Sequence, residues 1–313
     1  MSNVAAGTVW NLPNYFGELF TASPLQTPVL RMAGGLNGGA QTDNFEFPVS
    51  QEYTHETAAQ PAITETASLA APTAISYVRT QYKNVCQIHQ EQVSVSYAKL
   101  STMGRLSGIA TAGAPRTVAD ELAFQIARVL EKVARDVEYS FLQGTYNIAT
   151  TAGTYNNTRG LNAAAALGAT VAAGGASLSK NLIQTLLRAM FAAGAVFQNP
   201  ICIVNAYQKQ LLSSIYGYAP TDRNVGGLNI KQIETDFGNL GVVLDAFQST
   251  SVFLVADMSV VRPVSCPVPG KGNMFYEPLA KSGAAEIGQL YGQIGLDHGP
   301  YWMHGSITGL ATS

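Results

Sequence analysis

The chain has 313 residues, of which 12% are charged, and its net charge at pH 7 is −2. An ordinary soluble domain carries roughly 25% charged residues. The hydrophobic share of 47% is normal, so small and uncharged polar residues take the place of the missing charge. A solitary soluble protein covers its surface with Lys, Arg, Glu and Asp. The composition therefore indicates a surface largely covered by partners or by other copies of the chain.

Charge and hydropathy also limit the class of protein. No basic stripe or arginine-rich tail is present, which argues against strong binding to the phosphate backbone of a nucleic acid. The first basic residue is Arg31, so the charged start of a signal peptide is absent. Residues 160–179 are mostly Ala and Gly, and residues 189–208 are interrupted by Pro200 and its polar neighbours. Neither stretch predicts a membrane span.

The first 40 residues predict an arm rather than a domain. They contain only two charges, Glu18 and Arg31, several prolines, and a glycine-rich run over residues 33–39. A free arm with so little charge would adhere to other surfaces. We therefore expect it to lie on another part of the molecule or on a neighbouring molecule.

Residues 44–53 and 75–97 predict the two strands of a large hairpin. Apolar and polar residues alternate over 44–53, and Pro48 favours an edge strand. The same alternation returns over residues 92–97, and residues 54–74 between the strands predict an extended polar loop. An isolated two-stranded ribbon is marginal in water, so we expect this one to lie on a neighbour.

Residues 118–143 give the clearest periodicity, that of an amphipathic helix with Thr117 as its cap, Asp120 in its first turn and Gly144 after its end. The predicted apolar stripe consists of Leu122, Ile126, Val129, Val133 and Val137, widened by Leu130 and Phe141. The opposite face is charged, and Glu131–Arg135 and Lys132–Asp136 have the spacing of ion pairs. Phe124 and Leu142 fall on that charged face, where a fully solvated helix would not favour them.

The remainder of the chain predicts a mixed α+β body. Residues 145–179 predict a loop of small residues, and residues 217–228 a second loop. Helices are expected at 180–193 and 206–216. Strands are expected at 200–205, 230–236, 240–245, 252–256, 260–265, 274–280, 284–296 and 300–309.

A search for chemistry-bearing motifs predicts no catalytic, cofactor-binding or metal-ligating residue. The glycine clusters at 34–39 and 174–175 lack the Gly-Lys-Ser/Thr ending of a phosphate loop. The four histidines, His55, His89, His298 and His304, show no metal-ligand spacing. We interpret them as surface or packing residues.

The cysteines also predict no active site. Cys86, Cys202 and Cys266 are far apart and form no Cys-x-x-Cys pair, which favours reduced structural thiols in a cytoplasmic setting. Cys86 and His89 lie three positions apart on an expected strand, so their side chains should point to opposite faces. The chain also has no Gly-x-Ser-x-Gly elbow.

Four blocks of sequence resemble the major capsid proteins of tailed bacteriophages: QIHQEQVSVSYAKL (87–100), ADELAFQIARVLEKVARDVEYSFLQG (119–144), IETDFGNLGVVLD (233–245) and YEPLAKSGAAEIGQLYGQIGL (276–296). The resemblance spans about residues 40–310 and implies the Hong Kong 97-like capsid fold. The implied parts are an N-terminal arm (1–40), an extended β-hairpin loop (41–98), a peripheral domain with a long spine helix (99–144), an axial domain (145–265) and peripheral return strands (266–313).

The resemblance implies a shell subunit, not an enzyme, that self-assembles as pentamers and hexamers into the icosahedral head around a double-stranded DNA genome. A portal and scaffolding or decoration proteins are its implied partners, in a virion assembled in the bacterial host cytoplasm. Because the chain begins with the arm, we expect a separate scaffold or none. The near-neutral charge predicts that the shell encloses DNA without gripping a sequence. Two alternatives stay open: an encapsulin-like nanocompartment shell that holds cargo enzymes, and a soluble enzyme.

Overall fold

The computed structural model describes residues 26–37, 39–54, 56, 58–102, 121–216, 232–281 and 283–312. Several features expected from sequence lie outside these residues: most of the arm, the cap at Thr117, Asp120, His55 and the loop over 217–228. In the described part of the chain, no helix is long and apolar enough to cross a lipid bilayer.

Helices and strands alternate irregularly along the chain, as expected for an α+β protein. The helices are α1 (Pro28–Ala33), α2 (Glu65–Ser68), α3 (Tyr97–Thr102), α4 (Glu121–Gln143), α5 (Leu161–Ala165), α6 (Lys180–Ala192), α7 (Ala206–Tyr216) and the 3-10 turn η1 (Tyr301–Met303). The strands are β1 (Ala40–Gln41), β2 (Glu46–Tyr53), β3 (Arg79–Val85), β4 (Gln87–Ser96), β5 (Ala169–Ala172), β6 (Pro200–Val204), β7 (Gln232–Thr235), β8 (Gly238–Leu244), β9 (Phe253–Asp257), β10 (Arg262–Ser265), β11 (Met274–Pro278), β12 (Ala285–Asp297) and β13 (His304–Thr308).

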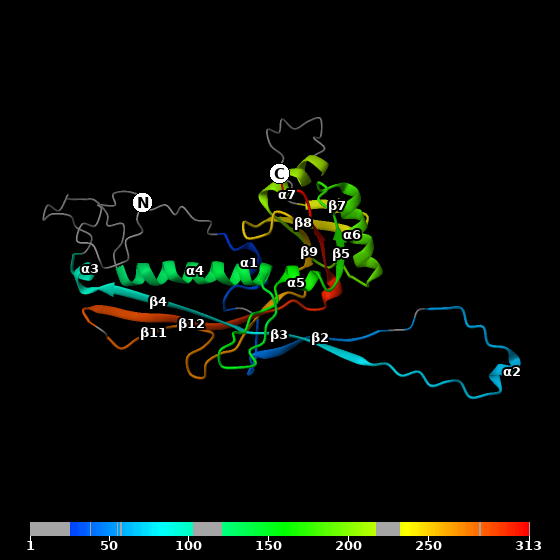
Figure 1. Cartoon of the computed structure of the whole chain (residues 1–313), viewed down its shortest axis with the longest axis horizontal. Helices are drawn as coiled ribbons and strands as arrows, with labels where there is room; N and C mark the ends of the chain where they lie inside the picture. The colour runs from blue at the N-terminus through cyan, green and yellow to red at the C-terminus, as the bar shows by residue number, and fades with distance from the viewer. Residues whose placement is uncertain are drawn as a thin grey trace.

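A five-stranded sheet forms a long platform beneath α4 (Figure 1). Its strands run in the order β1-β10-β12-β11, and β4 pairs with β12 as well. The β4–β12 pairing is antiparallel from Ala285 opposite Ser96 to Ile294 opposite Gln87. Helix α4 packs on both strands. The two longest strands and the longest helix therefore support one another along their lengths.

The second lobe contains a six-stranded sheet, in the order β5-β13-β9-β6-β8-β7, together with α6 and α7 (Figure 1). Strands β6 and β9 are buried at every position. Because side chains alternate across a strand, one set, including Ile201 and Leu254, faces the core that α4 completes. The other set, including Cys202 and Phe253, faces the core that α6 completes. These two strands thus belong to both hydrophobic cores.

Helix α4 confirms the predicted stripe over its second half, where Val133, Val137 and Phe141 are buried. The prediction for Leu130 was wrong, since this side chain is 39% exposed. Leu142, assigned by periodicity to the charged face, is fully buried because α1 and α5 pack around this end of the helix.

The ion pairs on α4 follow the predicted pattern in part. The Lys132 ammonium lies 3.7 Å from the Asp136 carboxylate, which confirms that pair. Glu131 accepts from Arg128 at 2.8 Å, one turn earlier in the helix. Both pairs lie on the exposed side of the helix, where such contacts stabilise by only a few tenths of a kcal/mol.

Three expectations about segments need correction. Residues 145–179, expected as a loop, contain α5 and β5, and β5 pairs in parallel with β13. The polar loop over 54–74 contains the single turn α2, capped by the Thr64 hydroxyl. The strand expected over 75–97 as one side of the hairpin divides into β3, which pairs with β2, and β4, which pairs with β12 in the five-stranded sheet.

Gly144 provides a test of the packing at the end of α4. A Cβ atom on Gly144 would lie 2.3 Å from the Ser140 carbonyl oxygen and 2.4 Å from that of Thr158. We expect Gly144→Ala to lower the free energy of unfolding by about 1–3 kcal/mol, because backbone must shift to admit the methyl group. The matched control is Gly153→Ala, which meets no atom within 4 Å. Equal midpoints of chemical denaturation for the two variants would contradict this packing.

Candidate assembly surfaces

The hairpin of β2 and β3 projects far from both lobes (Figure 1). The strands pair antiparallel from Glu46 opposite Val85 to Tyr53 opposite Arg79, with one irregularity between Pro48 and Ser50. Every described residue from 58 to 81 is exposed. The hairpin therefore has no hydrophobic core of its own, as its sequence predicted.

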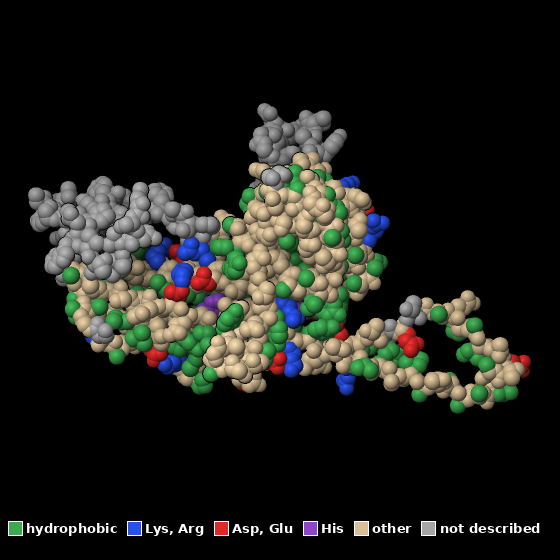
Figure 2. Space-filling view, in the orientation of Figure 1, with side chains coloured by type: hydrophobic (Ala, Val, Ile, Leu, Met, Phe, Trp, Pro, Cys, Tyr) green, Lys and Arg blue, Asp and Glu red, His purple; other side chains and the backbone are tan. Residues whose placement is uncertain are grey.

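Large apolar side chains occur along this projecting segment (Figure 2). The exposed fractions are 71% for Ile63, 85% for Leu69 and 80% for Val78. The only charged residues described between positions 54 and 78 are Glu56 and Glu65. Because burying such side chains gains about 25 cal/mol per Å² of apolar surface, this segment favours a second surface that covers it.

The root of the hairpin is fixed by a buried amide, Asn84, that sequence patterns did not single out. The Asn84 Nδ2 donates to the carbonyl oxygens of Leu296 (2.7 Å) and Arg159 (3.1 Å). The Asn84 Oδ1 accepts from the backbone N–H groups of Arg159 (2.7 Å) and Val85 (2.9 Å). These four bonds use the full capacity of an amide side chain. They tie β3 to β12 and to the segment before α5.

Polar contacts on the surface reinforce this root. The Lys83 ammonium lies 2.9 Å from a Glu46 carboxylate oxygen across the hairpin, and the Tyr146 hydroxyl donates to the other oxygen of Glu46. The rings of Tyr82 and Tyr301 meet edge to face, with centroids 4.9 Å apart. The hairpin is therefore anchored rigidly at its base and uncovered at its tip.

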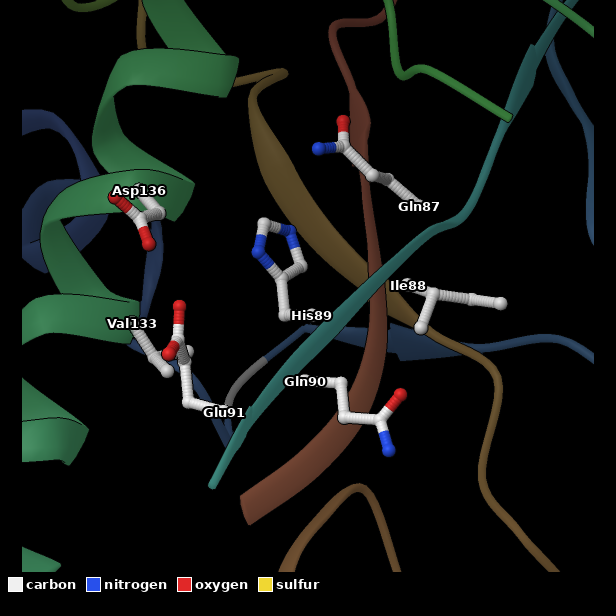
Figure 3. Close-up of a pocket in the computed structure, with 7 residues that line it drawn as sticks. All are labelled: Gln87, Ile88, His89, Gln90, Glu91, Val133 and Asp136. Atoms are coloured by element: carbon white, nitrogen blue, oxygen red, sulfur yellow. The ribbon is translucent and has the colours of Figure 1, made fainter. Parts of the chain in front are cut away.

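A small cavity of about 260 Å³ opens between β4 and α4 (Figure 3). The His89 imidazole points from β4 toward α4, with Asp136 and Glu91 on its flanks. Lys132 bonds to both of these carboxylates and so neutralises part of their charge. Burial lowers the pKa of His89 to about 4, so its ring is neutral at pH 7.

The six-stranded lobe carries a separate exposed apolar group. Phe191 at the end of α6 is 63% exposed, and nearby Val196 is 59% exposed. The centroid of the Phe237 ring lies 5.7 Å from that of the Phe191 ring and 6.1 Å from that of the Phe197 ring. Aromatic side chains grouped in this way are typical of protein–protein contact surfaces.

The structure separates the cysteine and the histidine that the sequence search considered together. Cys86 is buried with Phe47 and Val264 in a small core, and its thiol lies 3.6 Å from the Val264 carbonyl oxygen. Burial raises the pKa of Cys86 to about 12, so the thiol is protonated and a poor nucleophile. His89 faces the cavity under α4 instead.

His298 and His304, interpreted as surface or packing residues, are fully buried. They lie where β12 leads into β13, and the His304 Nε2 lies 2.5 Å from the His298 carbonyl oxygen. Burial lowers the pKa of both rings, that of His298 to about 3. Among the described residues, no group of three or more His, Cys, Asp or Glu side chains is placed to hold a metal ion.

Comparisons with known proteins agree over almost the entire chain. A family model described as SU10 major capsid protein matches residues 2–311. The cyanophage A-1(L) capsid has a TM-score of 0.67 at 14% identity, covering 99% of this chain and 98% of that one. The capsid of a native GTA particle has a TM-score of 0.60 at 11% identity, covering 96% of each chain. No curated protein matches the sequence.

A cellular shell protein shares the same architecture. The holo-SrpI encapsulin complex from Synechococcus elongatus PCC 7942 has a TM-score of 0.56 at 11% identity, covering 97% of this chain and 93% of that one. At such identities the likeness establishes the fold only. The fold therefore includes phage heads and encapsulins alike, and the family match separates them.

The fold is the Hong Kong 97-type capsid architecture. The chain belongs to the SU10 major capsid protein family and is a subunit of a phage head shell. This confirms the family resemblance and favours the phage head over the encapsulin alternative.

Removing the buried amide should destabilise the hairpin root. We expect Asn84→Ala to lower the free energy of unfolding by about 2–4 kcal/mol, because the buried backbone groups of Arg159 and Leu296 lose their partner. Hydrogen exchange over residues 79–85 should accelerate by at least about tenfold. Gln81→Ala, an exposed change on the same strand, is the control. Equal exchange in the two variants would refute the role of Asn84.

The buried histidines predict acid sensitivity. In the folded chain His89, His298 and His304 have lowered pKa values, so below pH 6.5 the unfolded chain binds protons that the folded chain does not. The free energy of unfolding should fall as the pH decreases from 6.5 to 5, by up to about 1.4 kcal/mol per pH unit for each histidine. Denaturant titrations at pH 7, 6 and 5 measure this slope. His298→Gln should reduce it by one histidine's share, and an unchanged slope would contradict the assignment.

Proposed function

We propose that each part of this subunit has a distinct role in building the shell. In this proposal α4 is the spine helix, and it forms the peripheral domain together with the five-stranded sheet. The six-stranded lobe is the axial domain, which surrounds the local symmetry axes of pentamers and hexamers. The hairpin is the extended loop, and the residues before β1 form the arm. The separation of the two sheets and the length of α4 support this division.

The extended loop contacts a neighbouring subunit. The observation that carries this step is the exposure of Ile63, Leu69 and Val78 on a ribbon whose root is rigidly held. Among the residues that the structure describes, none covers these side chains, which leaves apolar surface for another molecule to bury. The projecting geometry suits a heterologous contact, in which one patch meets a different patch on the next copy and the ring closes.

Many weak contacts of this kind suit a closed shell. A standard interface buries about 1,600 Å² in total, worth a gross of about 40 kcal/mol at 25 cal/mol per Å². Ordering and desolvation cancel most of that sum. A single contact therefore stays reversible during assembly, while several contacts per subunit hold the finished shell together.

The proposal also covers partners and setting. The role is structural rather than catalytic, and assembly takes place in the host cytoplasm. A portal occupies one vertex, with a separate scaffold or decoration proteins where the head requires them. The net charge of −2 lets the shell enclose DNA without binding it tightly.

Deleting the projecting segment tests the central step. A variant in which a short glycine turn replaces residues 54–74 should fold with an unchanged circular dichroism spectrum, because no described residue between 58 and 74 is buried. It should fail to form particles under conditions in which the parent assembles, as measured by sedimentation velocity and electron microscopy. Normal particles from this variant would refute the contact with a neighbour.

A pair of point variants isolates the apolar contribution. Ile63→Ser with Leu69→Ser should raise the subunit concentration needed for assembly by at least about tenfold, without changing subunit stability. The control exchanges the same residues, Ile63→Leu with Leu69→Ile, and keeps their apolar surface. Light scattering measures the threshold concentration, and equal thresholds for the two pairs would show that burial of these side chains does not drive assembly.

A further inference from the structure

The cavity under α4 is lined by polar side chains from two elements. Gln87, His89 and Glu91 alternate along β4, so all three lie on the side of the strand that faces α4. The helix contributes Val133 and Asp136, which lie about one turn apart on its surface. The walls of the cavity therefore come from the longest helix and from one of the longest strands, two elements that support each other along their lengths.

The imidazole of His89 has a buried nitrogen without a partner. His89 is 7% exposed, and its Nε2 forms no hydrogen bond. The ring points from β4 toward α4 and so into the cavity (Figure 3). Most buried side-chain nitrogens in folded proteins have a hydrogen-bond partner. The exception at His89 therefore points to a group that binds in the cavity.

The side chains around this ring carry one excess negative charge. The carboxylates of Glu91 and Asp136 flank the imidazole, and the Lys132 ammonium bonds to both of them, at 3.7 Å from that of Asp136. The His89 ring is neutral at pH 7, so two negative charges meet one positive charge among these residues. Both carboxylate side chains stay partly exposed, Glu91 by 33% and Asp136 by 50%. They therefore keep acceptor sites for a second cation.

The acceptors in the cavity select the kind of cation. Among the described residues, no three His, Cys, Asp or Glu side chains are placed to hold a metal ion, so these acceptors do not form a metal site. A neutral imidazole presents one acceptor nitrogen and carboxylates only accept, so a ligand with several N–H donors satisfies both. The cavity of about 260 Å³ is far larger than the roughly 30 Å³ that one water molecule takes up. It has room for an ammonium or guanidinium group with part of an alkyl chain, and Val133 gives that chain an apolar wall.

We propose that the cavity between β4 and α4 binds an organic cation with several N–H donors, an alkylammonium or a guanidinium group. The cation donates to the Nε2 of His89 and to the carboxylates of Glu91 and Asp136, and it balances the charge that Lys132 leaves. Two sources offer this chemistry: a free diamine or polyamine, and a Lys or Arg side chain of a neighbouring subunit. The site lies away from the hairpin tip (Figure 1), so it does not depend on the contact proposed for the extended loop.

Saturation-transfer NMR of ligand protons tests the site on the purified subunit. At pH 7, 1,4-diaminobutane should bind with a dissociation constant of about 1–10 mM, as expected for a few partly exposed charge contacts. Its hexamethyl derivative has the same chain and charge but no N–H donor, and it should bind at least about fivefold more weakly. Equal binding of the two cations, or no saturable binding of the diamine, would overturn the proposal.

Substitutions separate this site from nonspecific attraction. Asp136→Asn removes the excess charge and His89→Leu removes the acceptor nitrogen, so each should raise the dissociation constant of the diamine at least about fivefold. Glu131→Gln, on α4 but outside the cavity, should leave it unchanged. Asp136 is exposed, so its variant should fold even where His89→Leu destabilises the subunit. Unchanged binding in Asp136→Asn would overturn the proposal.

Particles assembled without DNA identify the source of the cation. Diamine binding of equal strength in particles and in the subunit assigns the site to a free amine. Loss of diamine binding on assembly, together with a higher assembly threshold for Asp136→Asn, assigns it to a side chain of a neighbouring subunit.

Discussion

Double-sided burial of β6 and β9 is the constraint on which the rest of the structure depends. Each strand presents alternate side chains to two different cores, one completed by α4 and the other by α6. Strands buried on both faces need apolar residues at nearly every position, and Pro200–Val204 and Phe253–Asp257 satisfy this almost throughout. Because the same backbone belongs to both cores, the α4 platform and the six-stranded lobe form one continuous body. This continuity gives the projecting hairpin a rigid base.

The hairpin and the N-terminal segment differ in whether their side chains and backbone groups find partners within the same chain. Segment 26–36 finds its partners within the same chain, through Val29 and Leu30 in the core and through the carboxylate of Glu138. No described part of the chain covers the hairpin tip, since Ile63 and Leu69 remain exposed although its root is held by Asn84. Membership of the SU10 major capsid protein family accounts for this asymmetry. A shell subunit must be stable alone and still keep apolar surface for its neighbours.

Sequence patterns predicted the elements that carry a strong period and missed those that do not. The helix now described as Glu121–Gln143 and the strand Ala285–Asp297 were expected within a few residues of their bounds. The single strand expected over 75–97 was wrong, because it divides into β3, which pairs with β2, and β4, which pairs with β12. α5 and β5 were missed because Ala and Gly give little contrast between faces, and pairing with β13 stabilises β5. The predicted apolar stripe of α4 was too wide, because it included Leu130, whose side chain is exposed. Local periodicity does not show how far the neighbouring sheet extends across the helix.

The sequence by itself determined the class of the protein, through low charge, a long hairpin expected to lie on a neighbour and family-like blocks in a specific order. Only the tertiary structure decided which polar residues are buried and hold distant segments together. Asn84 and Glu138 resemble ordinary surface residues in the sequence, and they became structural once β12 and α1 enclosed them. The physical reason is that desolvation depends on segments far away in the chain. No local pattern records that Val29 will lie on Glu138 109 positions later.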